Sequence, residues 1–257
     1  MILSASLHKE IHKNMQFFID TANLNEIEEA QALGVVDGVT TTPSLMVKEN
    51  IIGPDAIKTH HKSICNLVDD HVSVEVIATD FEGMVKESRA LAKIDDKIVV
   101  KLPMTKDGIK AIKCLSNQGI RTNCNLVFTT GQAILAAKAG ATYVSPFIGR
   151  MDDIAHHGMG LITQIAQVYQ TFRCSTKILA ASIRHTAHLI HCAEEGADIA
   201  TAPFQVIEGL FNHPMTDIGL ARFLSDFKEE DLPKKNGQNV LKANEHETNE
   251  NIAMVNS

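Results

Sequence analysis

Lys101 is the residue of this sequence best suited to covalent chemistry. It ends the apolar run KIVVK, which is typical of a buried β-strand. Burial disfavours the charged ammonium, and the neutral amine is a nucleophile that can form a Schiff base with a carbonyl group. The structural alternative is an internal ion pair, in which Lys101 would contact Asp20 or Glu75.

Polar side chains stand at or just after the ends of several other apolar runs. They are Asp20, Thr40, Thr41, Thr42, Glu75, Asn123 and Asn125. If these runs are the strands of a (β/α)8 barrel, their ends converge on one mouth, where the catalytic residues of such barrels lie. Two carboxylates and one amine at that mouth fit both a reactive lysine and an internal ion pair.

Arg150, Ser182 and Arg184 form a second group, which could bind a phosphate. They follow the sixth and seventh predicted strands, and phosphate groups commonly bind beside the last strands of a barrel. Guanidinium groups offer paired donors and serine offers a hydroxyl, and both suit a phosphate monoester. A single arginine would more simply form a surface salt bridge, but two arginines beside a serine favour an anion site.

The elements that must position these side chains alternate between strands and helices. Short apolar or β-branched runs predict eight strands, at residues 16–20, 36–40, 72–77, 98–102, 120–125, 142–146, 177–181 and 198–201. Amphipathic stretches between them predict helices, among them residues 25–33, 81–93, 105–117, 131–139 and 183–194. Gly34, Gly119, Gly140 and Gly196 each precede a predicted strand, where the glycine that ends a helix belongs.

Eight strand–helix units in about 210 residues favour a closed barrel over an open, doubly wound sheet. No GxGxxG follows the first predicted strand and no GxxxxGK[ST] occurs, so two common nucleotide-binding motifs are absent. We therefore predict an α/β protein with a single (β/α)8 TIM barrel. Residues 228–257 are dense in Asn, Glu and Lys, and we expect a polar, mobile tail there, with a short amphipathic helix as the alternative.

The composition argues against several classes of protein. The 24 Lys and Arg residues against 31 Asp and Glu residues give a net charge of −7, so there is no general basic field to attract nucleic acid or an anionic membrane. The sequence has no run of eighteen apolar residues and no apolar start long enough for a signal peptide. Five scattered cysteines without a CxxC pair indicate reduced thiols. We expect a cytoplasmic protein that binds neither nucleic acid nor a membrane.

Several histidines occur in pairs or at helical spacing, as metal ligands often do. They are His60, His61, His156, His157, His185, His188 and His191. No HExxH frame and no acidic ligand accompanies them, so we interpret them as solvated helix histidines and predict no metal.

Seven motifs resemble the small transaldolase and fructose-6-phosphate aldolase family. They are FIDTAN at 18–23, GVTTTPS at 38–44, VSVEVIATD at 72–80, IVVKLP at 98–103, YVSPFIGRMDD at 143–153, AASIRH at 180–185 and HPMTDIGLARF at 213–223. The resemblance covers residues 15–227 and implies a barrel with a C-terminal helix, no metal and no cofactor. It also implies a ring-shaped homo-oligomer, often a decamer. Residues 1–14 and 228–257 are then an N-terminal extension and a tail, and both lie outside the resemblance.

The resemblance implies a role for each candidate residue. Lys101 would form the Schiff base, Asp20 would be the acid and base at the sugar hydroxyl, and Glu75 would be the partner of a catalytic water. Asn125 would also face that water. The residues expected to bind the substrate are Thr42, Ser44, Phe147, Arg150, Ser182 and Arg184, the last three of them at its phosphate.

Two positions separate the branches of this family, and two others depart from it. Glu75 and Phe147 resemble the transaldolase branch, whereas the aldolase branch has Gln and Tyr at the matching places. Thr42 stands where the family has Asn, and Asn125 stands where it usually has Thr. Asn offers an amide where Thr offers one hydroxyl. Our hypothesis is that the two changes partly compensate each other, and the alternative is a changed donor sugar or a weakened enzyme.

The resemblance predicts a transaldolase-like transferase that moves a dihydroxyacetone unit between sugar phosphates through a lysine Schiff base. The implied substrates are fructose 6-phosphate, sedoheptulose 7-phosphate, erythrose 4-phosphate and glyceraldehyde 3-phosphate, which belong to the pentose phosphate pathway of carbohydrate metabolism. One alternative is an aldolase that releases free dihydroxyacetone. The other is a weakly active or silent paralogue that only binds sugar phosphates, which the Thr42 departure would favour.

Overall fold

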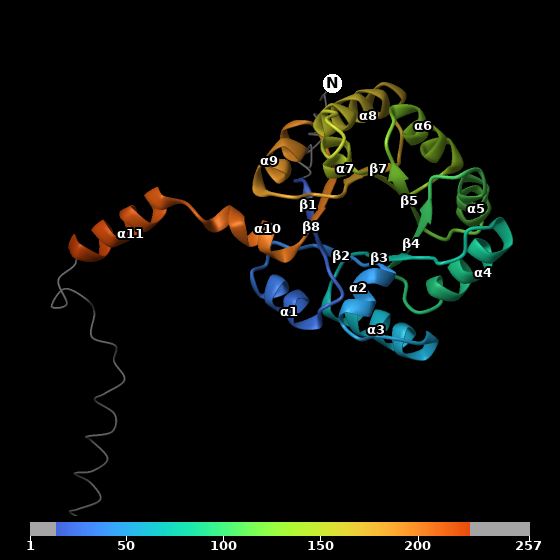
Figure 1. The fold of residues 1–257 in the computed structure, drawn as a ribbon, viewed down its shortest axis with the longest axis horizontal. Helices are drawn as coiled ribbons and strands as arrows, with labels where there is room; N and C mark the ends of the chain where they lie inside the picture. Colours follow the sequence, from blue (N-terminus) through green and yellow to red (C-terminus); the bar gives the residue numbers. More distant parts are fainter. Residues whose placement is uncertain (1–13, 227–257) are drawn as a thin grey trace, which may run out of the picture. The chain divides into compact units, whose positions relative to one another are not determined.

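Eight parallel strands close into a barrel in the computed structural model, which describes residues 14–226 (Figure 1). In chain order the strands are β1 (Gln16–Asp20), β2 (Gly38–Thr40), β3 (Val72–Glu75), β4 (Ile98–Pro103), β5 (Thr122–Val127), β6 (Tyr143–Pro146), β7 (Lys177–Ala180) and β8 (Ile199–Ala202). Each strand pairs with the next, and β8 pairs with β1. The predicted single (β/α)8 TIM barrel is confirmed.

Helices between the strands form the outer layer of the barrel. They are α1 (Leu24–Ala32), α2 (Pro43–Lys48), α3 (Pro54–Leu67), α4 (Phe81–Ala92), α5 (Lys106–Ser116), α6 (Thr130–Ala139), α7 (Ile148–Asp152), α8 (Gly158–Phe172) and α9 (Thr186–Glu194). After β8 come α10 (Phe204–Glu208), a 3-10 turn (Gly209–Phe211) and α11 (Pro214–Asp226). Two helices instead of one follow β2 (α2 and α3) and β6 (α7 and α8) before the next strand begins.

Local sequence signals account for where the helices begin and end. Thr129 and Gln132 form a capping box at the start of α6, which satisfies backbone donors that the helix leaves free. Gly140 ends the same helix with φ +87°, a left-handed conformation that glycine adopts without steric cost. The other glycines predicted to end helices, Gly34, Gly119 and Gly196, also have positive φ.

The inside of the barrel holds a layer of five buried apolar side chains. They are Phe18, Val99, Tyr143, Leu179 and Ile199. Side chains in a strand alternate between its two faces, so the residue two positions later points to the same side. Asp20, Lys101 and Thr201 therefore form the next layer inside the barrel, directly above Phe18, Val99 and Ile199.

The described part of the chain after Phe211 forms a compact unit of its own. Its helix α11 exposes the apolar side chains of Ile218, Leu220 and Leu224. The predicted N-terminal extension, apart from Asn14, and the predicted polar tail lie outside the described residues. None of the helices in residues 14–226 is long and apolar enough to cross a membrane.

Candidate active site

Lys101 lies in one wall of the barrel mouth, beside a carboxylate. The amine is in a buried side chain, with 6% of the residue exposed, and its Nζ lies 3.8 Å from Oε2 of Glu75. The parallel pairing of β3 with β4 places Glu75 directly opposite Lys101, which explains their proximity. The internal ion pair considered from the sequence is thus present, with Glu75 as the partner.

Asn125 holds this carboxylate in place. Its amide Nδ2 donates to Oε1 of Glu75 at 2.9 Å, so the two oxygens of Glu75 face the amide of Asn125 and the amine of Lys101. The other side-chain atom of Asn125, Oδ1, is buried and has no partner among the described residues. A buried acceptor without a partner is costly, and this one lies on the amide that contacts Glu75. We take it as a position where a water or a substrate hydroxyl could donate.

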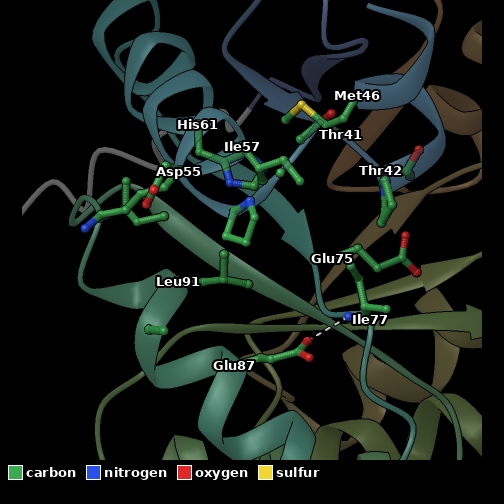
Figure 2. Close-up of a pocket in the computed structure, with 16 residues that line it drawn as sticks. Thr41, Thr42, Met46, Asp55, Ile57, His61, Glu75, Ile77, Glu87 and Leu91 are labelled. Carbon is green, nitrogen blue, oxygen red and sulfur yellow. Dashed lines mark hydrogen bonds between the residues drawn. The ribbon is translucent and has the colours of Figure 1, made fainter. Parts of the chain in front are cut away.

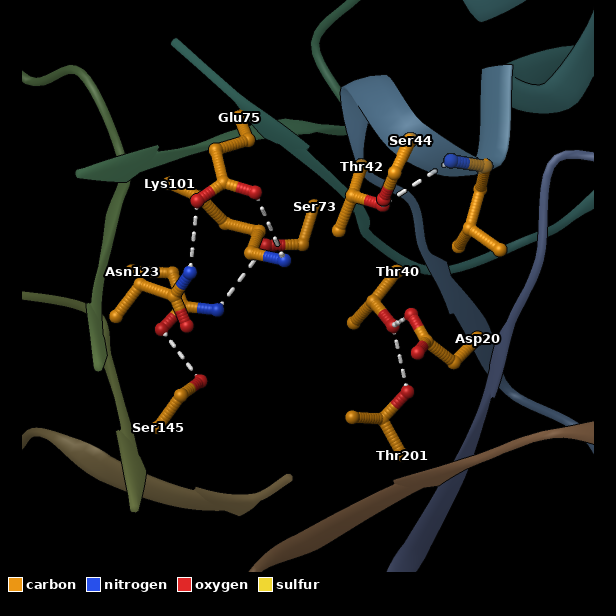
Figure 3. A network of polar contacts seen from close by, with 12 residues as sticks. Asp20, Thr40, Thr42, Ser44, Ser73, Glu75, Lys101, Asn123, Ser145 and Thr201 are labelled. Atoms are coloured by element: carbon orange, nitrogen blue, oxygen red, sulfur yellow. Dashed lines mark hydrogen bonds and ion pairs between the residues drawn. The ribbon is translucent and has the colours of Figure 1, made fainter. Parts of the chain in front are cut away.

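Asp20 lies in the opposite wall of the mouth, held by hydroxyl groups. Its Oδ1 accepts a hydrogen bond of 2.6 Å from Oγ1 of Thr40, which is itself 2.6 Å from Oγ1 of Thr201 (Figure 3). These three residues come from β1, β2 and β8, which are neighbours in the closed sheet. A carboxylate and an amine therefore face each other across the mouth from separate walls.

Three further buried polar side chains line the mouth, and strand ends did not predict them: Ser73, Ser145 and Thr201 (Figure 3). Oγ of Ser145 donates to Oδ1 of Asn123 at 2.8 Å, and Nδ2 of Asn123 donates to Oγ of Ser73 at 3.1 Å. Asn123 is paired in register with Lys101. The alternation of side chains along a strand would have predicted that Ser145 and Thr201 face the inside of the barrel, because each stands two residues after an inward-facing side chain of the buried layer.

The three residues predicted to bind phosphate lie on the two segments that follow β6 and β7. Backbone hydrogen bonds join these segments, from the amide of Gly149 to the carbonyl of Ser182 at 3.2 Å. A Cβ at Gly149 would collide with that carbonyl oxygen and crowd Arg184, so only glycine allows this approach. Ser182 has φ +61°, a left-handed conformation that is uncommon for a residue with a side chain.

Both arginines have local partners in this region. Nη2 of Arg184 lies 2.7 Å from Oδ2 of Asp153, and both side chains are about half exposed. The surface salt bridge considered from the sequence is thus present for Arg184. The guanidinium of Arg150 lies over the ring of Phe147, 4.9 Å from its centroid, which is a cation–π geometry. This contact places Phe147 beside the phosphate region, which we define as Arg150, Ser182 and Arg184.

His188 lies beneath Arg184 and is buried. Its Nδ1 accepts a hydrogen bond from the backbone amide of Arg184, and its Nε2 lies 3.1 Å from Oδ2 of Asp152. Burial and the neighbouring His185 lower the pKa of His188, while Asp152 opposes that shift. A neutral imidazole is needed for Nδ1 to accept and Nε2 to donate. His188 therefore supports the loop that carries Arg184.

The interpretation of the histidines as solvated helix residues is wrong for His188 and for His61. Both are buried, because each lies on the face of its helix that packs against the barrel. Burial lowers the pKa of His61 to about 4, with a smaller contribution from His60. No group of histidine, cysteine or acidic residues in positions 14–226 is arranged to hold a metal.

Thr42 and Ser44 contact each other at the start of α2. Their hydroxyl oxygens lie 2.9 Å apart, and Oγ1 of Thr42 accepts a hydrogen bond of 3.3 Å from the amide of Leu45. Thr42 is therefore the N-terminal cap of α2. Thr42 and Asn125, the two positions that depart from the family, therefore have different partners. Asn125 contacts Glu75, whereas Thr42 contacts its own helix.

A cavity of about 510 Å³ adjoins the mouth between α2, α3 and α4 (Figure 2). It shares Thr42 and Glu75 with the polar site, but most of its lining is apolar, including Met46, Ile57 and Leu91. A sugar phosphate needs a hydrogen-bonding partner for each hydroxyl group that it buries. Such a substrate is better matched by the polar layer of the barrel than by this cavity.

Comparisons with known proteins find similar sequences over most of the chain. A family model described as Transaldolase/Fructose-6-phosphate aldolase matches residues 17–255. A protein of Cytophaga hutchinsonii named "Probable transaldolase" is 65% identical over 215 residues, which cover 84% of this chain and 99% of that protein. A protein of Phocaeicola vulgatus with the same name is 62% identical over the same shares.

Solved structures show the same fold at low identity. A thiamine phosphate pyrophosphorylase from Pyrococcus furiosus matches with a TM-score of 0.53 and 15% identity, over 74% of this chain and 86% of that chain. The fold and the mouth define a (β/α)8 barrel protein with a lysine-centred site. The chain belongs to the transaldolase and fructose-6-phosphate aldolase family.

Proposed function

We propose that this enzyme is a transaldolase-like transferase, which moves a dihydroxyacetone unit between sugar phosphates through a Schiff base on Lys101. The observation that carries the proposal is the buried amine of Lys101, 3.8 Å from Glu75, in a mouth whose opposite wall carries Asp20. A nucleophilic lysine needs burial, a proton acceptor nearby and a second group to work on the bound substrate. Family membership and the relatives named "Probable transaldolase" support the same assignment.

In the first half of the reaction, the neutral amine of Lys101 attacks the ketose carbonyl. Water leaves, and a protonated imine remains. Glu75, held by Asn125, exchanges protons with the amine and with the departing water. Asp20 then removes the proton of the hydroxyl two carbons from the imine. The adjacent carbon–carbon bond breaks, its electron pair moves into the imine, and a phosphorylated aldehyde leaves.

The second half reverses these steps with another aldehyde. The three-carbon enamine stays bound to Lys101 and attacks the carbonyl carbon of an aldose phosphate. Asp20 returns its proton to the new alkoxide, so the base of the first half is the acid of the second. Water then hydrolyses the imine and frees the amine. Proton transfers balance over the cycle, and no cofactor takes part.

The phosphate group of each sugar would bind to Arg150, Ser182 and Arg184. This assignment rests on their positions in the two segments that follow β6 and β7 and on the paired donors that a guanidinium offers. Arg184 would exchange Asp153 for the more highly charged phosphate. The substrates we propose are fructose 6-phosphate and sedoheptulose 7-phosphate as donors, with erythrose 4-phosphate and glyceraldehyde 3-phosphate as acceptors.

We also infer that the enzyme acts in the cytoplasm, as a homo-oligomer. The apolar side chains exposed on α11, such as Ile218, Leu220 and Leu224, support self-association.

A coupled assay with fructose 6-phosphate tests the proposed activity. With erythrose 4-phosphate present, we expect rapid release of glyceraldehyde 3-phosphate. Without an acceptor, we expect a single turnover and little free dihydroxyacetone. Equal steady-state rates with and without the acceptor would instead identify an aldolase. A protein that binds fructose 6-phosphate but yields no product in either assay would be a silent paralogue.

A further inference from the structure

Thr201 lies at the far end of a short chain of hydroxyl groups that leads to Asp20. It stands on β8, two residues after the inward-facing Ile199, and its side chain is buried. Its Oγ1 lies 2.6 Å from Oγ1 of Thr40, and Oγ1 of Thr40 lies 2.6 Å from Oδ1 of Asp20. Figure 3 shows the three side chains on one wall of the mouth, with the hydroxyl of Thr40 between Asp20 and Thr201.

The number of hydroxyl protons determines which group donates in each of these two hydrogen bonds. An ionised carboxylate can only accept, so the single hydroxyl proton of Thr40 is donated to Asp20. Thr40 then has no proton for Thr201, and Thr201 must donate to Thr40. Both hydroxyl protons therefore point toward the carboxylate, and each hydrogen bond polarises and strengthens the next.

We propose that Thr201 is a positioning residue for the reaction, which acts on Asp20 through Thr40. This inference rests on the proposed role of Asp20 as the base and adds a residue that the family resemblance did not supply. The hydroxyl of Thr40 donates to Oδ1 of Asp20, so the other carboxylate oxygen, Oδ2, is presented to the substrate hydroxyl. Without the proton of Thr201, the hydroxyl of Thr40 loses its donor and can turn away from Asp20.

The test compares variants of Thr201 in the full-length protein. Thr201→Val removes the hydroxyl at nearly constant volume, and we expect kcat for transfer from fructose 6-phosphate to fall by up to about tenfold, the upper end of what one hydrogen bond between neutral groups contributes. KM should change little, because Thr201 does not contact the substrate. Thr201→Ser keeps the hydroxyl and should retain most of the activity. Thr201→Ala is the second variant without the hydroxyl if valine prevents folding.

A mass measurement separates positioning from a general structural effect. Borohydride added with fructose 6-phosphate reduces both the uncleaved six-carbon imine and the three-carbon imine that remains after cleavage. Imine formation does not need Asp20, but cleavage does. We therefore expect Thr201→Val to raise the share of the six-carbon adduct, as Asp20→Asn should do more strongly.

Thr122→Val is the matched control. Thr122 is a buried threonine on β5 whose Oγ1 has no partner among the described residues, so this variant should resemble the parent protein in rate and adduct ratio. An unchanged adduct ratio in folded Thr201→Val and Thr201→Ala, with a raised ratio in Asp20→Asn, would overturn the inference and leave the proposed function intact. An Asp20→Asn ratio equal to that of the parent would instead refute the role of Asp20, and the inference with it.

Discussion

The barrel mouth and the phosphate region of this protein are built in different ways. In the mouth, Lys101, Glu75 and Asp20 stand on strands, and hydrogen bonds from residues of other strands hold both carboxylates. In the phosphate region, Ser182 and Arg184 stand in a loop, and Arg184 is about half exposed in a salt bridge with Asp153.

The difference indicates which part is fixed before the substrate arrives. Groups that act on developing charge work best when the fold holds them in advance, as the strands hold Asp20 and Glu75. An exposed ion pair contributes only about 0–1 kcal/mol, so Arg184 can leave Asp153 for a phosphate at little cost. On the proposed roles, the fold holds the carboxylates of the mouth in place before the substrate binds, whereas Arg184 can exchange Asp153 for a phosphate.

Phe147 follows β6 and lies under the guanidinium of Arg150, and the family resemblance predicts that changing it alters the fate of the enamine. In Phe147→Tyr we expect free dihydroxyacetone to form up to about a hundredfold faster, because a phenol hydroxyl could position a water that protonates the enamine. The measurement is the release of dihydroxyacetone without an acceptor aldehyde. If the parent already releases it as fast as it transfers it, Phe147 does not protect the intermediate.

Arg184 tests the phosphate region alone. Loss of a charge-assisted hydrogen bond typically costs about 2 kcal/mol, so Arg184→Ala should raise KM for sugar phosphates about thirtyfold. KM for unphosphorylated sugars should change far less. Arg89→Ala is the control, because Arg89 is an exposed arginine on α4 that contacts Gln118. Equal effects of Arg184→Ala on both kinds of sugar would show that Arg184 has a structural role.

The smallest expected effects come from the exchange of Thr42 and Asn125 within the mouth. If the two residues have adapted to each other, Thr42→Asn and Asn125→Thr should each lower turnover by a few fold, and the double variant should recover it. If Thr42 weakens the enzyme, Thr42→Asn alone should raise turnover. Strictly additive effects would remove the compensation hypothesis and leave the transferase proposal unchanged.

The sequence predicted most of the fold because the strand signal is regular. The predicted strand 16–20 matches β1, but the predicted strand 120–125 lies two residues early, since β5 runs from Thr122 to Val127. Leu126 has φ +59°, and the pairing of β5 with β6 shifts between Cys124 and Val127. An irregularity of this kind leaves no mark in apolar periodicity.

The candidate site was predicted less completely, because spacing along the chain does not give contacts across the barrel. Strand ends located Lys101, Asp20 and Glu75, and their roles stay predictions. The hydroxyl chain from Thr201 depends on the closure of β8 onto β1. The burial of His188 depends on how α9 packs against the barrel, which the spacing of histidines does not reveal.

Mass spectrometry of the borohydride-treated enzyme tests the central claim most directly. After incubation with fructose 6-phosphate and reduction, we expect a three-carbon adduct on the peptide that contains Lys101, and none in Lys101→Arg, which keeps the charge but cannot form the imine. Lys97 is an internal comparison, since its Nζ contacts the backbone carbonyls of Cys65 and Val68, and it should remain unlabelled. An adduct on another lysine, or an active enzyme that is never labelled, would contradict the account.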